Sequence, residues 1–260
     1  MPRLQNKTAL ITGGARGIGA EIARCFSREG AHVIVADLDL AGAAAIAHEI
    51  GGAAFYLDVS SQSGWDELEA AHPTMDIVVN NAGITGFEDD HGPHDPEHGK
   101  LAAWQRVHAV NLDGTFLGCR YAIRAMRPKG RGAIINMSSR SGLVGVPGAA
   151  AYASSKAAVR NHTKSVALYC AAQGLNIQCN SIHPAAILTP MWQTLIGDGP
   201  DREARMAAMV ADTPLKRFGT VEEVAAIALM LASGDVGYMT GSEIHLDGGL
   251  LAGSAGSPGD

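Results

Sequence analysis

The chain alternates between short, almost continuously apolar runs and longer segments whose apolar residues have helical spacing. Uninterrupted apolar runs of about four to eight residues are typical of strands that are buried on both faces. The expected strands are Thr8–Thr12, His32–Ala36, Ala53–Leu57, Asp76–Asn80, Ala133–Ser138, Asn176–His183 and Glu243–Asp247. The helix-length segments between them include Gly17–Glu29, Ala103–Met126, Tyr152–Gln173 and Val221–Ser233.

Strands that alternate with helices predict a parallel sheet covered on both faces, so we expect a doubly wound α/β fold of about seven strands. Thr220, followed three residues later by Glu223, predicts a capping box at the start of the last helix. No repeat or low-complexity linker divides residues 1–260, and we expect a single domain. Two segments lack the alternation: a loop over Thr85–Lys100 and an insertion over about 189–214, which we interpret as a substrate lid.

Composition narrows the function classes. The chain has 260 residues, 47% of them hydrophobic and 18% charged, which suits a globular domain with a large core. A net charge of −6 with no basic run argues against nucleic acid as a partner. No stretch of about 18 apolar residues and no apolar signal region are present, and the four cysteines have no ligand spacing. We therefore expect a cytoplasmic protein with a small-molecule substrate and no membrane partner.

A glycine-rich loop follows the first expected strand and leads into the first expected helix. It reads Gly13-Gly14-Ala15-Arg16-Gly17-Ile18-Gly19. Glycines let the backbone approach a pyrophosphate, and the helix that follows offers free N–H groups and the positive end of its dipole. Such a loop can also be a plain turn, but its place at the first strand–helix junction favours a dinucleotide site and a Rossmann-type fold. The loop residues expected to bind the cofactor are Gly13, Arg16, Gly17, Ile18 and Gly19.

The end of the second expected strand bears on the choice of dinucleotide. Asp37 lies there, followed by Leu38. A carboxylate at this place can accept hydrogen bonds from the adenosine ribose and repel a 2′-phosphate, although it could also be a helix cap or a solvated strand end. Arg16 is the counter-argument, because a cation in the loop could pair with a 2′-phosphate. We give Asp37 more weight and predict NAD over NADP.

Tyr152 and Lys156 lie four residues apart in an expected helix, and therefore on the same face of it. A free tyrosine titrates near pH 10, so acting as a base near neutral pH requires its pKa to fall by roughly 2–3 units. One positive charge about 4 Å away supplies about that much stabilisation at an effective dielectric constant of about 20. This spacing alone is common by chance, so its meaning depends on the other motifs.

Several motifs occur together in a fixed order. They are Thr12-Gly13 with Gly17 and Gly19, Asn80-Asn81-Ala82-Gly83, Ser139 thirteen residues before Tyr152, and Tyr152 with Lys156. This set resembles the short-chain dehydrogenase/reductase family, from Lys7 to the Asp247-Gly248-Gly249 segment. Within that family, Ile135–Ser139, Ser181–Pro184, Thr189–Met191 and Thr240–Glu243 are most similar to bacterial hydroxysteroid and related secondary-alcohol dehydrogenases.

The resemblance implies a role for each member of the catalytic set. Tyr152 would be the general acid/base on the substrate oxygen, and Lys156 would lower its pKa and hold the cofactor ribose. Ser139 would hydrogen-bond the substrate oxygen; Ser138 and Ser141 are nearby alternatives, and only the family spacing selects Ser139. Asn111 matches the family's helix-kinking asparagine, which links the lysine to solvent through water, although a purely structural bond is the alternative.

The resemblance also extends the cofactor site beyond the glycine loop. Asp58 and Val59 would contact adenine, Asn81, Ala82 and Gly83 would line the adenosine ribose, and Ile187 and Thr189 would meet the nicotinamide. The sequence departs from the family pattern at Pro184-Ala185, where a glycine usually follows the proline. The alanine adds a methyl group beside the expected nicotinamide pocket.

Two further expectations concern metals and assembly. Histidines and aspartates gather in the Thr85–Lys100 loop without the fixed spacing of a zinc site, so we expect no metal. They are Asp89, Asp90, His91, His94, Asp95 and His98. The segment Tyr152–Gln173 is apolar on more than one face, and family members pair these helices, so we expect a homotetramer.

The substrate is the least determined feature. Val144, Met191, Trp192 and Leu195 would form an apolar wall over the nicotinamide, which favours a bulky secondary alcohol such as a hydroxysteroid or a cyclic alcohol. A 3-oxoacyl-carrier-protein reductase is an alternative, but it would prefer NADPH and a basic docking patch. A glucose 1-dehydrogenase and a dinucleotide-sensing scaffold without turnover also remain open. The complete Tyr–Lys–Ser set speaks against the scaffold.

Overall fold

The computed structural model describes residues 2–88, 92–192 and 196–253. Their strands form one seven-stranded sheet in the order β3-β2-β1-β4-β5-β6-β7, with every neighbouring pair parallel. The strands are β1 (Thr8–Thr12), β2 (His32–Asp37), β3 (Ala53–Tyr56), β4 (Ile77–Asn80), β5 (Arg131–Met137), β6 (Asn176–Pro184) and β7 (Glu243–Leu246). The chain winds outward from β1 to one edge and then from β4 to the other, so a crevice opens where the winding reverses.

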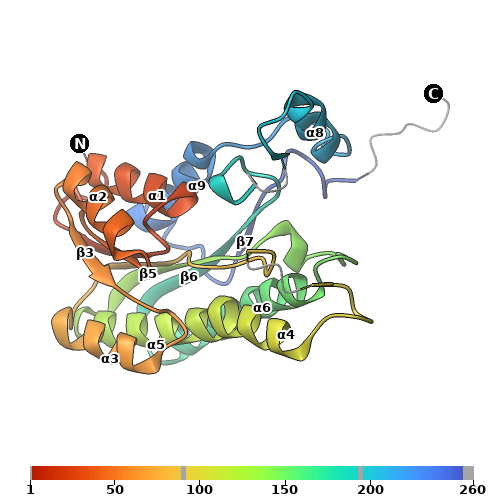
Figure 1. The fold of residues 1–260 in the computed structure, drawn as a ribbon. Coiled ribbons are helices and arrows are strands. Elements are labelled where there is room, and N and C mark those ends of the chain that lie inside the picture. Colours follow the sequence, from red (N-terminus) through yellow and green to blue (C-terminus); the bar gives the residue numbers. More distant parts are fainter. Residues whose placement is uncertain (1, 89–91, 193–195, 254–260) are drawn as a thin grey trace.

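Helices cover both faces of this sheet (Figure 1). One layer contains α1 (Gly17–Arg28), α2 (Leu40–Ile50) and α9 (Val221–Ser233). The opposite layer contains α3 (Gln62–Ala71), α4 (Leu101–His108), α5 (Gly114–Met126) and α6 (Ala150–Ala172). A short helix, α8 (Arg202–Met209), stands apart from both layers, beyond α9. The predicted Rossmann-type α/β fold is confirmed.

Most predicted elements agree with the structure to within one or two residues at each end. The capping box of α9 is present: the Thr220 hydroxyl accepts from the Glu223 N–H, and the Glu223 carboxylate accepts from the Thr220 N–H. The expected helix over Ala103–Met126 is present, but it is not a regular α-helix throughout. A π-helical turn over Ala109–Asp113 separates α4 from α5. The apolar spacing is nearly continuous across this turn, so periodicity alone does not reveal it.

The apolar core is divided by the sheet. One cluster packs α1 and α9 against the sheet, and the other packs α3, α5 and α6 against its opposite face. A third, smaller cluster consists of Ile196, Val210 and Phe218, with Trp192 and Met206 packed against it. It lies in and beside the 189–214 segment. No helix in the described part of the chain is long and apolar enough to span a membrane.

Candidate active site

The glycine-rich loop has a backbone that other residues would not easily adopt. Gly13 has a φ of 64° and Gly17 a φ of 56°. A Cβ on Gly13 would lie 2.8 Å from Ala82 Cα, and one on Gly19 would lie 2.1 Å from the Gly13 carbonyl oxygen. Helix α1 begins at Gly17, and no side chain caps it. Its first N–H groups are therefore available to an anion, which fits the pyrophosphate of a dinucleotide.

Side chains from β1 and β4 hold this loop in place. The Asn81 amide donates to the carbonyl oxygens of Thr12 and Gly13, both at 3.0 Å. The Thr12 hydroxyl accepts from the N–H groups of Asn81 at 3.0 Å and Ala82 at 3.1 Å. Sequence reasoning quoted Thr12 as part of a motif but gave it no task. Its hydroxyl links the glycine loop to the Asn81–Gly83 segment.

The carboxylate of Asp37 reaches the glycine loop from the end of β2. It accepts hydrogen bonds from the N–H groups of Ala15 at 3.0 Å and Asp39 at 2.9 Å. Leu38 beside it is 61% exposed, and Arg16 is also exposed at the start of α1. The structure thus places the Asp37 carboxylate against the loop that carries Arg16, so the two residues expected to have opposite effects on cofactor choice lie at the same loop.

The expected adenine contacts lie at the end of β3. The Asp58 carboxylate accepts from the N–H of Ser60 at 2.9 Å and from its hydroxyl at 2.6 Å, so one of its oxygens organises the turn before α3. Val59 is buried, and its carbonyl oxygen accepts from the Trp65 indole at 2.9 Å. These bonds fix the backbone at the strand end.

Tyr152 and Lys156 both lie on α6, and the Lys156 Nζ is 5.8 Å from the centre of the Tyr152 ring. The ammonium group donates to the Met137 carbonyl oxygen at 2.9 Å, and burial lowers the pKa of Lys156 to about 8. Burial raises the pKa of the Tyr152 phenol, and a hydrogen bond with Ser139 opposes that rise. The expected lowering of the Tyr152 pKa by Lys156 is therefore not seen, because desolvation outweighs the favourable contacts.

The three candidate serines follow β5 and make different contacts. The Ser138 hydroxyl donates to the Lys156 carbonyl oxygen at 2.9 Å, so it is engaged by the α6 backbone. The Ser139 hydroxyl accepts from the Ser141 N–H at 3.1 Å and hydrogen-bonds Tyr152. Ser139 is thus the serine whose hydroxyl meets the phenol, in agreement with the family spacing.

Asn111 lies in the π-helical turn and is completely buried. Its side-chain oxygen accepts from the Ile84 N–H at 2.8 Å, and its amide donates to the Ile84 carbonyl oxygen at 2.9 Å and to Ser155 Oγ at 3.0 Å. A Cβ on Gly83 would lie 3.1 Å from the Asn111 oxygen and 3.2 Å from Lys156 Nζ. The Asn111 side chain therefore joins the segment after β4 to α6, directly beside Lys156.

The remaining expected cofactor contacts follow β6. Ile187 is 3% exposed and pairs with Gly219, which fixes the backbone after Pro184-Ala185. The Cβ of Thr189 lies 3.6 Å from the place a Cβ on Gly17 would occupy. The chain therefore brings Thr189 next to the glycine loop, although the two are far apart in sequence.

The residues expected to form the apolar wall come from two separate segments of the chain. Val144 is exposed in the loop before α6. Met191 and Trp192 lie in the short 3₁₀-helix Pro190–Trp192, while Leu195 lies outside the described residues. The Trp192 ring packs against Phe218 with ring centroids 5.7 Å apart. Trp192 is therefore part of the small cluster of the 189–214 segment, a packing role that the sequence analysis did not give it.

The loop over Thr85–Lys100 contributes a residue that sequence reasoning missed. The carboxylate of Glu88 accepts from the N–H groups of Thr85 and Gly86 at 2.7 and 2.8 Å, and its charge adds to the rise in the Tyr152 pKa. The His94 carbonyl oxygen accepts from the Ala150 N–H at 3.1 Å, which joins the loop to the start of α6. No local sequence signal distinguishes Glu88, because its nearness to Tyr152 depends on how the loop folds back.

The histidines of this loop do not form a metal-binding group within the described residues, where no cluster of three metal-ligating side chains occurs. His98 instead lies 3.0 Å from the Asp95 carboxylate. Asp89, Asp90 and His91 lie outside the described residues.

Known proteins are similar to this chain over nearly its whole length. A family model described as enoyl-(acyl carrier protein) reductase matches residues 13–251. The chain is 39% identical over 258 residues to a 3-beta-hydroxysteroid dehydrogenase from Comamonas testosteroni, covering 96% of this chain and 97% of that protein. It is 38% identical over 259 residues to an NADP-dependent (R)-specific alcohol dehydrogenase from Lentilactobacillus kefiri, covering 96% of this chain and 98% of that protein.

A solved structure gives the same result for the fold. The crystal structure of a proposed gluconate dehydrogenase from Agrobacterium tumefaciens matches with a TM-score of 0.88 at 32% sequence identity, covering 96% of this chain and 98% of that one. The names of these proteins differ in substrate and cofactor, whereas the fold and the class of reaction are shared. The resemblance drawn from the motifs is confirmed: the chain belongs to the short-chain dehydrogenase/reductase family and is an oxidoreductase that acts on CH–OH groups.

Proposed function

We propose that this protein interconverts a bulky, apolar secondary alcohol and its ketone, with NAD as the hydride carrier. The observation that supports this most strongly is the contact between Ser139 and Tyr152, with Lys156 one turn further along α6. The glycine loop follows β1, and so lies at the same carboxyl-terminal edge of the parallel sheet as Ser139, which follows β5. Ser139 stabilises the substrate oxygen, and Tyr152 exchanges a proton with it. A bound nicotinamide supplies or accepts the hydride.

The protonation states of Tyr152 and Lys156 indicate what each residue would do in the two directions of the reaction. Because the Tyr152 pKa is raised, the phenol holds its proton at neutral pH and is ready to act as an acid on a ketone oxygen. Alcohol oxidation needs the phenolate, so we expect its rate to increase with pH. Lys156, with a pKa of about 8, supplies positive charge beside the phenol mainly below that pH. Asn111 holds the segment after β4 against Ser155, the residue before Lys156, and we expect Lys156 also to hold the cofactor ribose.

The preference for NAD rests on Asp37. Its carboxylate lies against the N–H of Ala15 in the glycine loop, where negative charge opposes a 2′-phosphate. Arg16 at the same loop is the competing feature, and one relative is NADP-dependent by name. The other contacts we propose for the cofactor are Gly13, Gly17, Ile18, Gly19, Leu38, Asp58, Val59, Asn81, Ala82, Gly83, Tyr152, Ile187 and Thr189.

A hydroxysteroid or another cyclic alcohol is the substrate class that we favour, because a 3-beta-hydroxysteroid dehydrogenase is among the relatives and the 189–214 segment carries an apolar cluster. We propose that this segment covers the substrate, with Val144, Met191, Trp192 and Leu195 at the pocket. A sugar or sugar acid is the second candidate, favoured by the likeness to a proposed gluconate dehydrogenase.

We also propose a homotetramer. The outer side of α5 and α6 carries Phe116, Leu168 and Tyr169, which are 49%, 71% and 48% exposed. Side chains of this kind gathered on two adjacent helices are typical of an interface between subunits. Light scattering should give a mass of about four chains, and a monomer at micromolar concentration would contradict the proposal.

A substrate panel tests the proposed function directly. Secondary alcohols, hydroxysteroids, aldoses, sugar acids and 3-oxoacyl thioesters are each assayed with NAD(H) and NADP(H), and kcat/KM is compared. We expect the highest value for a cyclic or steroid alcohol with NAD. A preference for 3-oxoacyl thioesters with NADPH would replace the proposal by a reductase of fatty-acid type. Tight dinucleotide binding without turnover of any substrate would favour a sensing scaffold.

A further inference from the structure

A buried histidine at the end of β6 faces the loop that carries the catalytic serine. His183 is 0% exposed and contacts two groups. Its Nδ1 lies 3.3 Å from the carbonyl oxygen of Ser139, and its Nε2 lies 2.8 Å from Ser181 Oγ. None of the sequence motifs gave His183 a role.

The partners determine the tautomer of this imidazole. A carbonyl oxygen can only accept, so Nδ1 must carry the hydrogen that is donated to Ser139. Burial lowers the pKa of His183 to about 4, so the ring is neutral at physiological pH and its Nε2 accepts from the Ser181 hydroxyl. The ring is thus a fixed donor directed at the backbone of Ser139.

The bond from His183 is made to the Ser139 carbonyl oxygen, in the short turn that follows β5. The Ser139 carbonyl oxygen also accepts from the Gly142 N–H at 2.9 Å, which is a bond within the same short turn. The N–H of Ser138 donates to the Ile182 carbonyl oxygen at 2.9 Å, as part of the β5–β6 pairing that ends here. The His183 side chain therefore extends the support from β6 one residue beyond the sheet, to the residue whose hydroxyl meets Tyr152.

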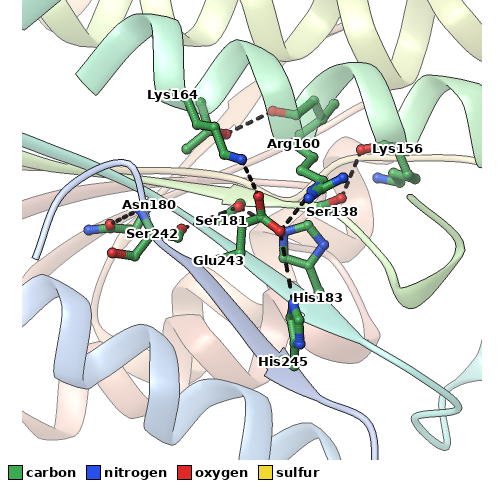
Figure 2. Close-up of polar contacts among 12 residues, drawn as sticks. Ser138, Lys156, Arg160, Lys164, Asn180, Ser181, His183, Ser242, Glu243 and His245 are labelled. Carbon is green, nitrogen blue, oxygen red and sulfur yellow. Dashed lines mark hydrogen bonds and ion pairs between the residues drawn. The ribbon is translucent and has the colours of Figure 1, made fainter. Parts of the chain in front are cut away.

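A charged cluster on β7 and α6 holds the histidine from the other side (Figure 2). The His183 and His245 rings meet edge to face with centroids 5.6 Å apart. The Glu243 carboxylate, on the same strand as His245, pairs with Arg160 at 2.7 Å and with Lys164 at 2.5 Å. The charged and titratable groups around His183 are thus Glu243 and His245 on β7 and Arg160 on α6, with the Ser139 carbonyl opposite.

The same cluster fixes the helix that carries the base. Arg160 and Lys164 lie one and two turns after Lys156 on α6, so their ion pairs act on the same helix that carries Tyr152 and Lys156. Their ion pairs with Glu243 join the middle of α6 to β7, while His183 joins β6 to the serine loop. The helix that carries Tyr152 is thereby attached to β7, and the loop that carries Ser139 is attached to β6.

We propose that His183 is a positioning residue for the reaction: its Nδ1–H holds the Ser139 backbone so that the serine hydroxyl stays on the Tyr152 phenol. The expected effect on kcat rests on the proposed function. The expected effect on the order of the Ser139–Gly142 loop does not. Without the bond, the loop from Ser139 to Gly142 shifts among several positions, and the contact that opposes the rise in the Tyr152 pKa is weakened.

Two amide substitutions separate this role from simple core packing. In His183→Asn the amide nitrogen can take the place of Nδ1 and still donate to Ser139, whereas in His183→Gln it takes the place of Nε2 and leaves the carbonyl without this donor. Both variants bury a polar amide of similar size. Thermal denaturation is measured for each, so that a loss of activity can be compared at equal folded fraction.

The kinetic readout is the pH profile of kcat for alcohol oxidation. We expect His183→Gln to lower kcat about tenfold or more and to move the apparent pKa upward, with KM for NAD unchanged. His183→Asn should stay within about threefold of the wild type with the profile unmoved. Groups facing Tyr152 that could also affect this profile are Glu88, Arg140 and Lys156, and none of them is altered. Equal losses in both variants, or a fall in kcat with an unmoved profile, would overturn the proposal.

A measurement that does not depend on enzyme activity distinguishes the positioning role of His183 from the proposed dehydrogenase function. Hydrogen exchange of the Ser141 and Gly142 amides, which donate to the Ser139 hydroxyl and carbonyl, is followed by mass spectrometry. Faster exchange in His183→Gln than in His183→Asn supports the positioning role even if no alcohol is oxidised, in which case the proposed function alone fails. Equal exchange in the two variants contradicts the positioning role even if the enzyme is active.

Discussion

The catalytic centre and the 189–214 segment are built in different ways. Ser139 and Lys156 are buried, Tyr152 is partly buried, and specific hydrogen bonds around them join β5 and the loop after it to β6 and α6. The 189–214 segment instead packs Trp192 on a small apolar cluster of its own, with Phe218. Hydrogen-bonded groups have a defined geometry, whereas a small apolar cluster can be repacked at modest cost. We therefore expect the first region to determine the class of reaction and the second to determine which substrate is accepted.

The substitution expected to have the largest effect is Tyr152→Phe, in the hydrogen-bonded region. Removing the phenolic oxygen leaves the ring and its packing but no group to exchange a proton, so we expect kcat to fall about 10²- to 10⁴-fold. Binding of NAD should change less than about threefold, because the glycine loop is untouched. Stopped-flow kinetics and titration calorimetry measure the two quantities. Activity within tenfold of the wild type would show that another group is the acid/base.

The acid stability of the catalytic side is the next test. His183 has a folded-state pKa of about 4 against an ordinary value of 6.5, so the unfolded chain takes up a proton first as the pH falls. Stability from this group is therefore present above pH 6.5 and is lost as the pH falls toward 4. Since a unit of pKa corresponds to about 1.4 kcal/mol, we expect a loss of about 2 kcal/mol by pH 4.5.

Urea denaturation of the wild type and His183→Asn at pH 7 and 4.5 measures this loss. The Glu243 carboxyl, with a pKa lowered to about 2, contributes its own loss only below its ordinary value of 4.5, which separates the two groups. A stability difference between the two proteins that is the same at both pH values would refute the assignment.

Asp37→Ala tests the region that selects the cofactor. Removing the carboxylate takes away both the repulsion of a 2′-phosphate and a hydrogen-bond acceptor worth about 1.5–3 kcal/mol when charged. We expect the ratio of kcat/KM for NAD to that for NADP to fall about tenfold or more. Arg16→Ala is the matched control, with a change in the opposite direction. No change in the ratio for Asp37→Ala would remove the basis for choosing NAD.

Trp192→Ala tests whether the 189–214 segment affects substrate binding without affecting the chemical step. The ring packs in the 189–214 segment and makes no contact with Tyr152 or Ser139 among those described. We expect KM for the best alcohol to rise about tenfold, with the pH profile of kcat unchanged. A shift of that profile would mean that the segment helps to set the chemistry and would break the distinction between the two regions.

The residues proposed for the reaction centre are easier to locate from sequence than the residues that surround them. Tyr152 and Lys156 are four residues apart on one helix, and the glycine loop is continuous in sequence, so local geometry is sufficient to place them. Ser139 was chosen over Ser138 only by family spacing, because adjacent residues in a loop can point either way. Their hydrogen bonds to Tyr152 and to the Lys156 carbonyl separate them in the structure.

Other features depend on contacts between distant segments and leave no local signal. Glu88 approaches Tyr152, and His183 approaches Ser139, only after the loop and the strand have folded. The pKa of Tyr152 was expected to be low because only its attraction to Lys156 in a uniform dielectric was considered. Burial of the phenol removes it from water and raises its pKa, and the sequence does not show how deeply it is buried. The homotetramer and the cofactor preference remain predictions.

The π-helical turn at Ala109–Asp113 has a consequence for the phase of the helix that contains it. A π turn contains one residue more than an α turn, and one residue corresponds to a rotation of about 100°. Val107 before the turn and Leu117 after it both face the interior with that extra residue present. A one-residue deletion in the turn would restore a regular helix and rotate one of these halves away from the core, so the length of this segment is constrained as strongly as its composition.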